Sequence, residues 1–523
     1  MSVREAGEIG AGLAVARRAR PIRGGERIHV VGAYGAGASA AALLAAWAGA
    51  DVDGCDPGGP SQYAAALEAA GVVVSGAHDP AHVARDPVPE RLAVTKALTA
   101  IDPDNAELVA ARAAGIPLEP WQQVVADAAY GRRLVAVAGT HGKSTTAGWL
   151  VHALEAAGTD PGAFVGALLP ATLTGIGVPA TARRGAGLPF VVEADEYAGN
   201  FDPYRPDVIV LTSAEWDHPD VFADRDAVLG TFEAWLHRAT EDRGPLAPPP
   251  VLVANVGDAG VADLVGRLGD WPGRLVPTLL VAADQPLDAR AATATFHTRW
   301  PATVGIVGRI AFAGRDGTVV EVATGPGDVH LGTMSLATAG RHNVSNALGV
   351  LGAGIAAGVR PDAMASGIAT FTGVGRRLER KGAARGVVVY DDYAHHPTAL
   401  RETLAAVRQR EPGRRLWAVY EPLTYHRTAA MLDAFAEVLA AADAVAIADI
   451  WAGRDPDTTI TSSAALARSV ADRAPGRPAE APGSVEATAA WLATRVEDGD
   501  VVLVMGGGRS YRIGELLLDH LEA

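Results

Sequence analysis

Residues 134–145 of the chain read LVAVAGTHGKST, and this stretch decides the fold. An apolar run, a glycine turn, a lysine followed by a hydroxyl residue and then a helical pattern predict the order strand, loop, helix. In such a loop, backbone N–H groups and the helix N-terminus surround a phosphate, the lysine reaches the outer phosphates and the serine holds Mg²⁺. The candidate phosphate-binding residues are Gly139, Thr140, His141, Gly142, Lys143, Ser144 and Thr145.

The match to the phosphate-loop pattern G-x-x-x-x-G-K-[ST] is incomplete, because Val137 stands where the first glycine belongs. An ordinary glycine-rich turn between a strand and a helix is the alternative. The composition argues against it: of 45 basic residues, three are lysines, namely Lys96, Lys143 and Lys381. A compact ammonium in a chain that otherwise uses the planar guanidinium of Arg indicates a specific need for a point charge.

The alternation of strand and helix continues on both sides of this loop and predicts parallel sheets covered by helices. The length of 523 residues corresponds to about three or four domains. Residues 296–335 differ, because short β-like pieces alternate with glycine turns and predict a small antiparallel patch. The predicted strands cover 27–31, 72–74, 134–138, 190–192, 208–211, 251–254, 387–390, 416–420, 444–448 and 501–505, and the predicted helices cover 38–47, 106–114, 122–129, 145–157 and 343–357.

Composition narrows the class of protein. Hydrophobic residues make up 49% and charged residues 20%, which excludes disorder, and the net charge of −15 disfavours broad binding to nucleic acid or anionic membrane. One cysteine, Cys55, excludes an internal disulfide framework and a Cys-based zinc finger. Residues 30–50 are uncharged and long enough for a membrane helix, but their glycines favour strand, turn and helix. We therefore expect a cytoplasmic protein without a signal peptide or membrane insertion.

Polar side chains follow two predicted strands of the central region. Glu193, Asp195 and Glu196 end one strand, and Asp217 and His218 follow the next. Carboxylates at the carboxyl edge of an α/β sheet suit a divalent cation, although a solvated acidic loop is an equal alternative. A lone histidine is usually structural, but its predicted position at the same edge favours a metal or phosphate role.

Three further motifs are candidates for ligand binding. Asn343 and Asn346 are three residues apart at the start of a helix, so they lie on one face of it. Their amides would either bind the edge of a nucleotide base or, as the alternative, one Asn would simply cap the helix. The run DDYAHHP at 391–397 follows a predicted strand, where α/β folds place their chemistry. The glycines at 32, 35 and 37 form a weak relative of the dinucleotide fingerprint.

Together these motifs resemble the Mur ligase family, the ATP-dependent enzymes that add amino acids to UDP-N-acetylmuramate in peptidoglycan synthesis. The shortened phosphate loop without its first glycine is this family's form. The resemblance covers nearly the whole chain and rests on VVGAYGAGAS (30–39), AVAGTHGKSTT (136–146), VVEADEY (191–197), AEWDHPDVF (214–222), GRHNVSNALG (340–349), FTGVGRRLE (371–379), YDDYAHHPTAL (390–400) and DIWAGRD (449–455).

The resemblance implies a three-domain α/β fold. Residues 1–125 would form a Rossmann-like domain for the UDP-sugar, residues 126–373 a P-loop ATPase-like domain with a parallel sheet and a small antiparallel patch, and residues 374–523 a Rossmann-like domain for the amino acid. The implied activity is ATP-dependent ligation of L-alanine to the carboxylate of UDP-N-acetylmuramate through an acyl phosphate. The family members that add D-glutamate or a diamino acid carry a carbamylated lysine that bridges two Mg²⁺ ions in the central domain. No lysine lies between Lys143 and Lys381 here, so that bridge cannot form, which fits the alanine-adding members.

Other functions stay open at this point. The recycling ligase that joins a whole tripeptide to UDP-N-acetylmuramate shares much of the DDYAHHPTA region. A non-catalytic nucleotide-sugar-binding relative and a Rossmann dehydrogenase are further alternatives, and the dehydrogenase leaves Lys143 and Ser144 unexplained. The oligomeric state, monomer or homodimer, is not fixed by the sequence.

The resemblance also implies residue roles. The residues Lys143, His218 and Arg376 would be catalytic, and ATP would contact the phosphate loop together with Asn343 and Asn346 (adenine), Asp392 (ribose), Arg376 and His395. The Mg²⁺ ligands would be Ser144, Glu193 and His218. The UDP-sugar would bind Gly32, Gly35, Gly37 and Asp56, and the amino acid would bind Tyr393, His426 and Arg427.

The acceptor stretch departs from the family pattern. The alanine-adding members carry Q-P-H-R-Y-[ST]-R-T, whereas residues 421–428 read EPLTYHRT. Leu423 and Thr424 therefore stand where His and Arg are expected, which leaves the amino-acid specificity in doubt. We expect Arg427 to be the main anchor of the acceptor carboxylate, because a buried carboxylate is held best by a guanidinium fork.

Overall fold

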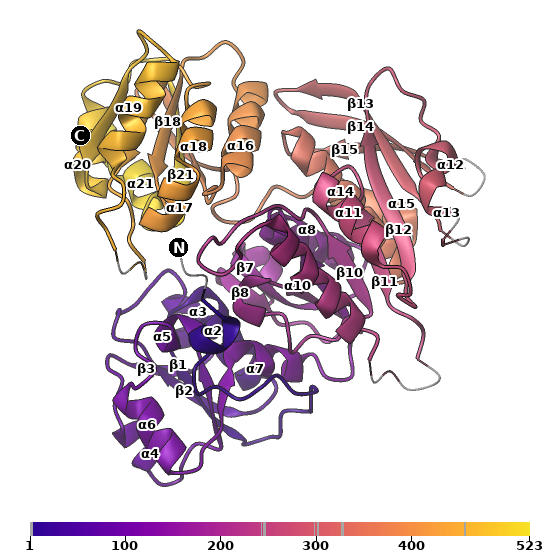
Figure 1. The fold of residues 1–523 in the computed structure, drawn as a ribbon, viewed down its shortest axis with the longest axis vertical. Helices are drawn as coiled ribbons and strands as arrows, with labels where there is room; N and C mark the ends of the chain where they lie inside the picture. The colour runs from indigo at the N-terminus through magenta and orange to yellow at the C-terminus, as the bar shows by residue number, and fades with distance from the viewer. Residues whose placement is uncertain are drawn as a thin grey trace.

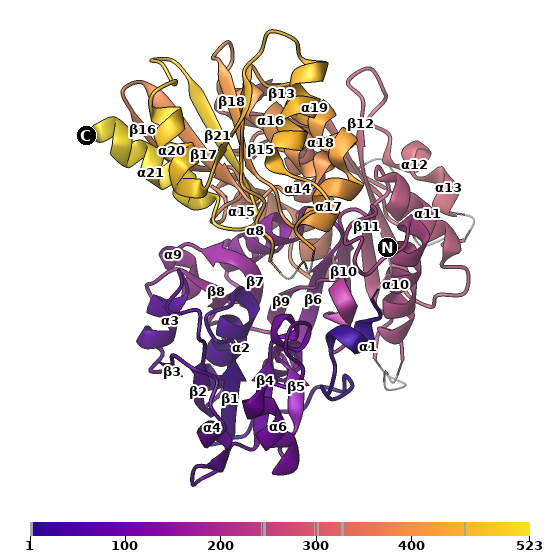
Figure 2. The ribbon, with the colours of Figure 1, turned by 60° about the vertical axis from the view of Figure 1, so that its left-hand side comes forward.

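The computed structural model describes residues 4–241, 243, 247–297, 299–300, 303–325, 329–453, 455 and 457–523. Within them the chain forms three sheets with helices against them, in the order first domain, central domain and third domain (Figure 1). The central domain lies between the other two, with the first domain below it and the third above it in Figure 2. The predicted three-domain α/β fold is confirmed.

The first domain is a five-stranded parallel sheet of order β3-β2-β1-β4-β5. Both faces of its central strands are covered, so β1 and β4 are nearly fully buried, as expected of a parallel sheet. The elements are α1 (Ala6–Ile9), β1 (Arg27–Val31), α2 (Ala36–Trp47), β2 (Asp51–Cys55), α3 (Ala64–Ala69), β3 (Val73–Ser75), α4 (Ala81–Ala84), β4 (Arg91–Val94), α5 (Lys96–Thr99), α6 (Ala106–Ala113), β5 (Leu118–Pro120) and α7 (Trp121–Ala128).

The uncharged stretch 30–50 forms the end of β1, a glycine turn and α2, as predicted. Its apolar character is explained by the burial of α2 in the core of the domain, where it packs against α7 and the sheet. Among the residues that the structure describes, no helix combines the length and the apolar character needed to cross a bilayer.

The central sheet has ten strands in the order β15-β14-β13-β12-β11-β10-β6-β9-β7-β8. Its middle is parallel, and β13 to β15 form the antiparallel patch that the sequence predicted. The strands are β6 (Arg133–Ala138), β7 (Gly162–Leu169), β8 (Ala180–Arg183), β9 (Pro189–Glu193), β10 (Val208–Leu211), β11 (Val251–Asn255), β12 (Arg274–Val281), β13 (Ile306–Gly314), β14 (Gly317–Thr324) and β15 (Val329–Leu336). The helices are α8 (Lys143–Ala156), α9 (Ala171–Thr174), α10 (Arg225–Arg238), α11 (Ala259–Arg267), α12 (Ala289–Ala292), α13 (Ala294–His297), α14 (Arg341–Ala356) and α15 (Pro361–Ala369).

The third domain has six strands in the order β16-β17-β21-β18-β19-β20, parallel except for the β16–β17 hairpin. Its strands are β16 (Glu379–Ala384), β17 (Val387–Asp392), β18 (Leu416–Glu421), β19 (Ala444–Ala448), β20 (Ala479–Gly483) and β21 (Val501–Gly506). Its helices are α16 (Pro397–Arg410), α17 (Tyr425–Ala430), α18 (Leu432–Leu439), α19 (Ser463–Arg473), α20 (Val485–Ala493) and α21 (Tyr511–Glu522). The carboxyl ends of β17 and β18 lead into the loops that meet the central domain.

Candidate active site

The phosphate loop joins the carboxyl end of β6 to the start of α8, in the middle of the central sheet. Gly139 has φ of 131° and Gly142 has φ of 79°, both in the region that favours glycine. A Cβ on Gly139 would lie 2.3 Å from Thr212 Oγ1, and one on Gly142 would lie 2.8 Å from Asn346 Oδ1. The two glycines therefore allow a tight loop over the helix N-terminus, which is an anion-binding position.

Lys143 is held by the loop and by the acidic motif that follows β9. Its Nζ donates to the Gly139 carbonyl at 2.6 Å and to Glu196 Oε2 at 2.9 Å, and it lies 3.6 Å from Asp195 Oδ1. Burial disfavours the charge, but the carboxylates of Glu196 and Asp195 outweigh it and raise the pKa of Lys143. The ammonium is therefore permanently charged, and a bound phosphate can replace a carboxylate as its ion-pair partner.

Ser144 and Glu193 form the second half of this site. Ser144 Oγ donates to Glu193 Oε1 at 2.9 Å and accepts from Arg377 Nη2 at 2.9 Å. The other oxygen, Glu193 Oε2, accepts from the backbone N–H of Gly166 at 2.6 Å. A hydroxyl and a carboxylate oxygen beside a phosphate loop are the ligand types that Mg²⁺ prefers.

His218 lies in a neighbouring group of potential metal ligands. Asp195, Glu196 and His218 each offer one ligand atom, and these atoms lie within 4.8 Å of one another. The His218 ring stands 4.8 Å from the ring of Tyr197, and its backbone has φ of 54°. Sequence reasoning thus placed His218 at the correct edge, and the structure brings it to Asp195 and Glu196.

A cavity of about 510 Å³ opens over the phosphate loop. Asn346 lines it, whereas Asn343 lies behind: its Nδ2 donates to the Ala339 carbonyl at 2.7 Å and its Oδ1 accepts from Asn346 Nδ2 at 3.4 Å. Of the predicted ATP-site residues, the cavity wall contains Thr140, His141, Gly142, Lys143, Ser144, Thr145, Asn346, Asp392 and His395.

The third domain supplies one wall of this cavity. Asp392 ends β17, and its carboxylate accepts from the backbone N–H groups of Leu378 at 2.7 Å and Ala394 at 2.8 Å. Burial, together with the positive charge of Arg427, lowers the pKa of His395 well below its usual value, so its ring is neutral. The polar groups at the carboxyl end of β17 therefore face the phosphate loop, as expected from the position of strand ends in α/β folds.

Three further residues that line the same cavity, His141, Glu215 and His396, form a group of potential ligands. His141 Nε2 lies 3.0 Å from Glu215 Oε2, and His396 Nδ1 lies 3.7 Å from the same oxygen. Burial and the nearby His141 lower the pKa of His396 to about 4. Residues from the phosphate loop, the loop after β10 and the third domain thus meet at one carboxylate.

A second cavity, of about 710 Å³, lies between all three domains. The first domain contributes Ala36, Gln62 and Tyr63 to its wall. It shares four wall residues with the cavity over the phosphate loop, and these are Ser144, Glu193, Arg377 and Tyr393. The two cavities therefore meet beside the phosphate loop.

Arg376 and Arg377 face different surroundings at the start of the third domain. Arg376 has φ of 58°, and its side chain donates to Asp391 Oδ2 at 3.1 Å, the Gly506 carbonyl at 2.8 Å and Ser510 Oγ at 2.7 Å. It lines the second cavity, whereas Arg377 lines both and contacts Ser144. The sequence-based choice of Arg376 thus missed Arg377, which lies nearer the phosphate loop.

The first-domain turn after β1 has the tight geometry that the glycines predicted. Gly32 has φ of 79°, and a Cβ on Gly37 would lie 2.1 Å from the Trp121 ring, so Gly37 serves packing. Gly35 caps the N-terminus of α2, and Asp56 Oδ2 accepts from the backbone N–H of Tyr34 at 3.0 Å. The turn and Asp56 lie together at the carboxyl ends of β1 and β2.

The acceptor stretch 421–428 begins at the end of β18 and enters α17. Arg427 is buried, and its guanidinium donates from Nε to Asp217 Oδ1 at 2.9 Å. His426 Nδ1 lies 3.0 Å from Asp455 Oδ1. Thr424 caps α17 with φ of 62°, and Leu423 pairs with Trp451 in a single bridge. The side chains of Arg427 and His426 therefore each have a carboxylate partner from the protein. Arg454 of the neighbouring DIWAGRD motif lies outside the described residues.

Several wall residues had no signal that sequence reasoning used. Glu215, His396 and Arg377 lie within motifs that were singled out, yet their roles depend on contacts between domains. A second arginine beside Arg376 and a second histidine beside His395 were visible in the motifs. The choice within each pair required the structure.

Family models match three consecutive stretches of the chain. The model of the Mur ligase family catalytic domain matches residues 27–133, that of the Mur ligase middle domain matches 137–354, and that of the Mur ligase glutamate ligase domain matches 376–508.

Curated relatives and a solved structure agree with these matches. A UDP-N-acetylmuramate–L-alanine ligase from Roseiflexus sp. (strain RS-1) is 36% identical over 501 residues, covering 94% of this chain and 98% of the relative. One from Frankia casuarinae is 35% identical over 521 residues, covering 94% and 97%. The crystal structure of a UDP-N-acetylmuramate–alanine ligase from Thermotoga maritima, 22% identical, superposes with a TM-score of 0.72 over 95% of this chain and 99% of that one, which shows the shared fold. The chain belongs to the Mur ligase family.

Proposed function

We propose that this chain is an ATP-dependent ligase that joins L-alanine to the carboxylate of UDP-N-acetylmuramate in peptidoglycan precursor synthesis. One observation carries the proposal: two cavities, one over a phosphate loop and one between the three domains, meet at Ser144, Glu193, Arg377 and Tyr393. Relatives named for this reaction align with 94% of the chain. A nucleoside triphosphate in one cavity and a carboxylate in the other would meet at this junction.

The residues present fit ATP and Mg²⁺. The left-handed Gly142 and the crowded Gly139 form a cradle that a Cβ would fill, and Lys143 supplies a buried cation. Ser144, Glu193 and His218 are the proposed Mg²⁺ ligands, and when bound the ion would neutralise charge on the phosphates. Asn346, positioned by Asn343, would contact the adenine, and Asp392 the ribose.

The chain's own groups would organise two displacements. The muramyl carboxylate attacks the γ-phosphorus of ATP and ADP leaves, and the alanine nitrogen then attacks the acyl carbon, loses a proton and expels phosphate. Lys143, Arg377 and, from the domain boundary, Arg376 would hold the phosphate oxygens. His395, which is neutral because burial lowers its pKa, would contact phosphate by hydrogen bonding. Closure of the third domain over the junction excludes water from the acyl phosphate.

Each of the three proposed domains would bind a different substrate. Residues 1–125 would bind the UDP-sugar, with Gly32, Gly35, Gly37 and Asp56 at the nucleotide end and Tyr63 facing the junction. Residues 126–373 would bind ATP, and residues 374–523 would bind the amino acid through Arg427, Tyr393 and His426. We place the reaction in the cytoplasm and the enzyme as a monomer or homodimer.

Phosphate release in the presence of ATP, Mg²⁺, UDP-N-acetylmuramate and an acceptor tests the proposal. We expect release that requires both the UDP-sugar and the acceptor, with L-alanine preferred over glycine and L-serine. The tripeptide L-alanyl-γ-D-glutamyl-diaminopimelate belongs in the same panel, because Leu423 and Thr424 replace the expected His and Arg. If the tripeptide gives the highest kcat/KM, the recycling reaction is the correct one.

A further inference from the structure

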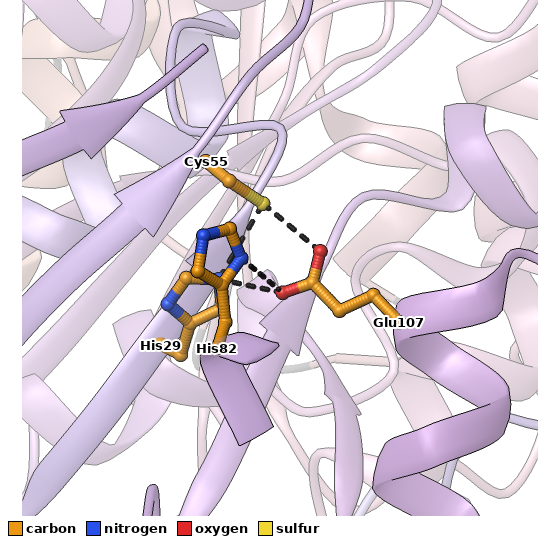
Figure 3. Close-up of side chains that lie close together, drawn as sticks. All are labelled: His29, Cys55, His82 and Glu107. Carbon is orange, nitrogen blue, oxygen red and sulfur yellow. Dashed lines mark hydrogen bonds and ion pairs between the residues drawn. The ribbon is translucent and has the colours of Figure 1, made fainter. Parts of the chain in front are cut away.

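Four side chains with metal-ligand chemistry converge in the first domain (Figure 3). His29 lies in β1, Cys55 ends β2, His82 lies in α4 and Glu107 lies in the first turn of α6. Each offers one ligand atom, and the four atoms lie within 4.8 Å of one another. The group joins parts of the chain that are 78 residues apart, from position 29 to position 107.

The spacing of these atoms suits a tetrahedral zinc ion. Zn–N bonds of about 2.0–2.1 Å and Zn–S bonds of about 2.3 Å place neighbouring ligands of a tetrahedron roughly 3.3–3.6 Å apart. His29 Nε2 lies 3.4 Å from Cys55 Sγ, and Cys55 Sγ lies 3.3 Å from Glu107 Oε2. The nitrogens of His29 and His82 lie 2.8 Å and 3.0 Å from Glu107 Oε1. Small outward shifts would open these contacts to coordination distances.

In both histidines, the ring nitrogen that points away from the group contacts an oxygen of the protein. His29 Nδ1 lies 3.0 Å from Asp53 Oδ1, and His82 Nε2 lies 3.0 Å from Ser75 Oγ. Histidines that bind metal almost always use their other ring nitrogen in this way, because that bond fixes the tautomer and the ring orientation. The bonds to Asp53 and Ser75 leave His29 Nε2 and His82 Nδ1 directed at Cys55 and Glu107.

Burial and charge add an independent argument. His29, Cys55 and Glu107 are fully buried, and the side chain of His82 is 19% exposed. With a metal bound, the Glu107 carboxylate and a Cys55 thiolate with two neutral imidazoles would carry a charge of −2, which one divalent cation neutralises. Without the cation, burial and the charge of Glu107 raise the pKa of Cys55, so metal binding would release the thiol proton. His78 contacts the same group, because its Nδ1 lies 3.1 Å from Cys55 Sγ and 3.6 Å from Glu107 Oε2.

We infer that the first domain binds one zinc-type transition-metal ion through His29, Cys55, His82 and Glu107. Four protein ligands fill a tetrahedron, so the site is structural rather than catalytic. The ion would tie α4 and α6 to the sheet strands β1 and β2. The mixed set of one sulfur, two imidazoles and one carboxylate favours zinc or cobalt over magnesium.

The single cysteine makes a specific experiment possible. Full-length protein is treated with a chelator, dialysed and titrated with Co²⁺, which replaces Zn²⁺ and absorbs visible light. A sulfur-to-cobalt charge-transfer band in the near ultraviolet reports a thiolate ligand, and Cys55 is the one thiol in the chain. We expect this band to saturate at one equivalent and to disappear when Zn²⁺ is added. The carboxylate and histidine groups of the ATP site contain no sulfur, so they do not contribute.

Variants assign the ligands. Cys55→Ser should lose the charge-transfer band, and His82→Gln should weaken Co²⁺ binding at least tenfold. His152→Gln, a change in α8 of the central domain, is the matched control and should keep both the band and the stoichiometry. Bound zinc should also raise the midpoint of thermal unfolding of the wild type by several degrees and leave that of Cys55→Ser unchanged.

The wild-type titration decides the inference even if a variant does not fold. Without a charge-transfer band at excess Co²⁺, the four side chains form a hydrogen-bond network and no metal site. A band that persists in folded His82→Gln with unchanged affinity would also overturn the ligand set. Because no readout depends on ligation, the outcome is independent of the proposed reaction.

Discussion

Arg427 of the third domain forms a buried ion pair with Asp217 of the central domain. Their Nη2 and Oδ1 atoms are 2.8 Å apart, and each side chain is 4% exposed. Burial disfavours the charge of Asp217, but Arg427 outweighs it and holds the pKa of Asp217 well below its usual range. Arg427 Nη2 also lies 3.3 Å from His218 Nδ1. The residue expected to anchor the amino acid thus also couples the third domain to the proposed metal edge.

Removal of Asp217 should destabilise the protein. Asp217→Asn leaves the Arg427 guanidinium buried without its carboxylate, and loss of one partner of a buried pair costs about 3–5 kcal/mol. The midpoint of thermal unfolding measures this loss. Asp263→Asn, which breaks an exposed pair with Arg225, is the control and should change stability by less than about 1 kcal/mol. Equal effects of the two changes would contradict the prediction.

Arg427→Lys should weaken binding of the amino acid more than binding of the nucleotide. An ammonium lacks the planar fork that can hold a carboxylate while bonding Asp217, so we expect the KM for L-alanine to rise about tenfold or more. The KM for ATP should hardly change. Steady-state kinetics with each substrate varied in turn test this, and a parallel rise in both constants would instead indicate a general loss of domain closure.

Lys143→Ala should abolish ligation while the fold remains. The loss of one preorganised cation from the phosphates should cost at least about 2–3 kcal/mol of transition-state stabilisation. His152→Ala, farther along the same helix, serves as the control and should keep wild-type turnover. Turnover above one tenth of wild type in folded Lys143→Ala would exclude the phosphate-loop assignment. Circular dichroism checks folding, because Glu196 loses its partner.

Changes at the proposed metal ligands should raise the Mg²⁺ requirement. Glu193→Gln replaces a carboxylate that contacts Ser144 and Gly166, and His218→Ala removes a ring nitrogen. A Mg²⁺ titration of turnover should show a higher half-saturating concentration for each variant. If both variants match wild type, the acidic motif is a structural partner of Lys143 and does not bind the metal.

Glu421 should make the third domain sensitive to pH. Burial raises the pKa of Glu421 from its ordinary 4.5 to about 7. The folded state therefore binds this proton more tightly than the unfolded state does. The resulting contribution of Glu421 to stability is fully present below pH 4.5 and is lost as the pH rises through 7. The loss amounts to about 3 kcal/mol. Thermal unfolding at pH 5 and pH 8 should show Glu421→Gln gaining stability relative to wild type at the higher pH, whereas a change at the exposed Glu437 should not.

The sequence predicted the parallel cores well. Strands 27–31, 208–211 and 444–448 begin and end as expected, and the other predicted strands and helices outside residues 296–335 differ from the observed ones by at most two residues at either end. These segments are continuous apolar runs bounded by glycine or polar residues, which is the pattern of strands buried on both faces. The phosphate loop followed from the same local pattern, since its backbone path depends on Gly139 and Gly142.

Several strands and the contacts between domains could not be predicted from local patterns in the sequence. The edge strands β8, β16 and β20 were not predicted, because glycine, alanine and charged residues leave little apolar periodicity in them. The interior strands β4, β7 and β12 were not predicted either. Arg377 was not distinguished from Arg376, because adjacent residues differ only in the direction that the hinge backbone gives them. The pairing of Arg427 with Asp217 joins positions 210 residues apart and depends on how two domains pack.

The wall that the two cavities share has a consequence for inhibitor design. Ser144, Glu193, Arg377 and Tyr393 border both spaces, so a single molecule that reaches past these four side chains would occupy both. Joining a nucleotide mimic to a muramate mimic by a short linker would turn the second binding event into an intramolecular one. Its gain in affinity would come from effective concentration rather than from any additional contact.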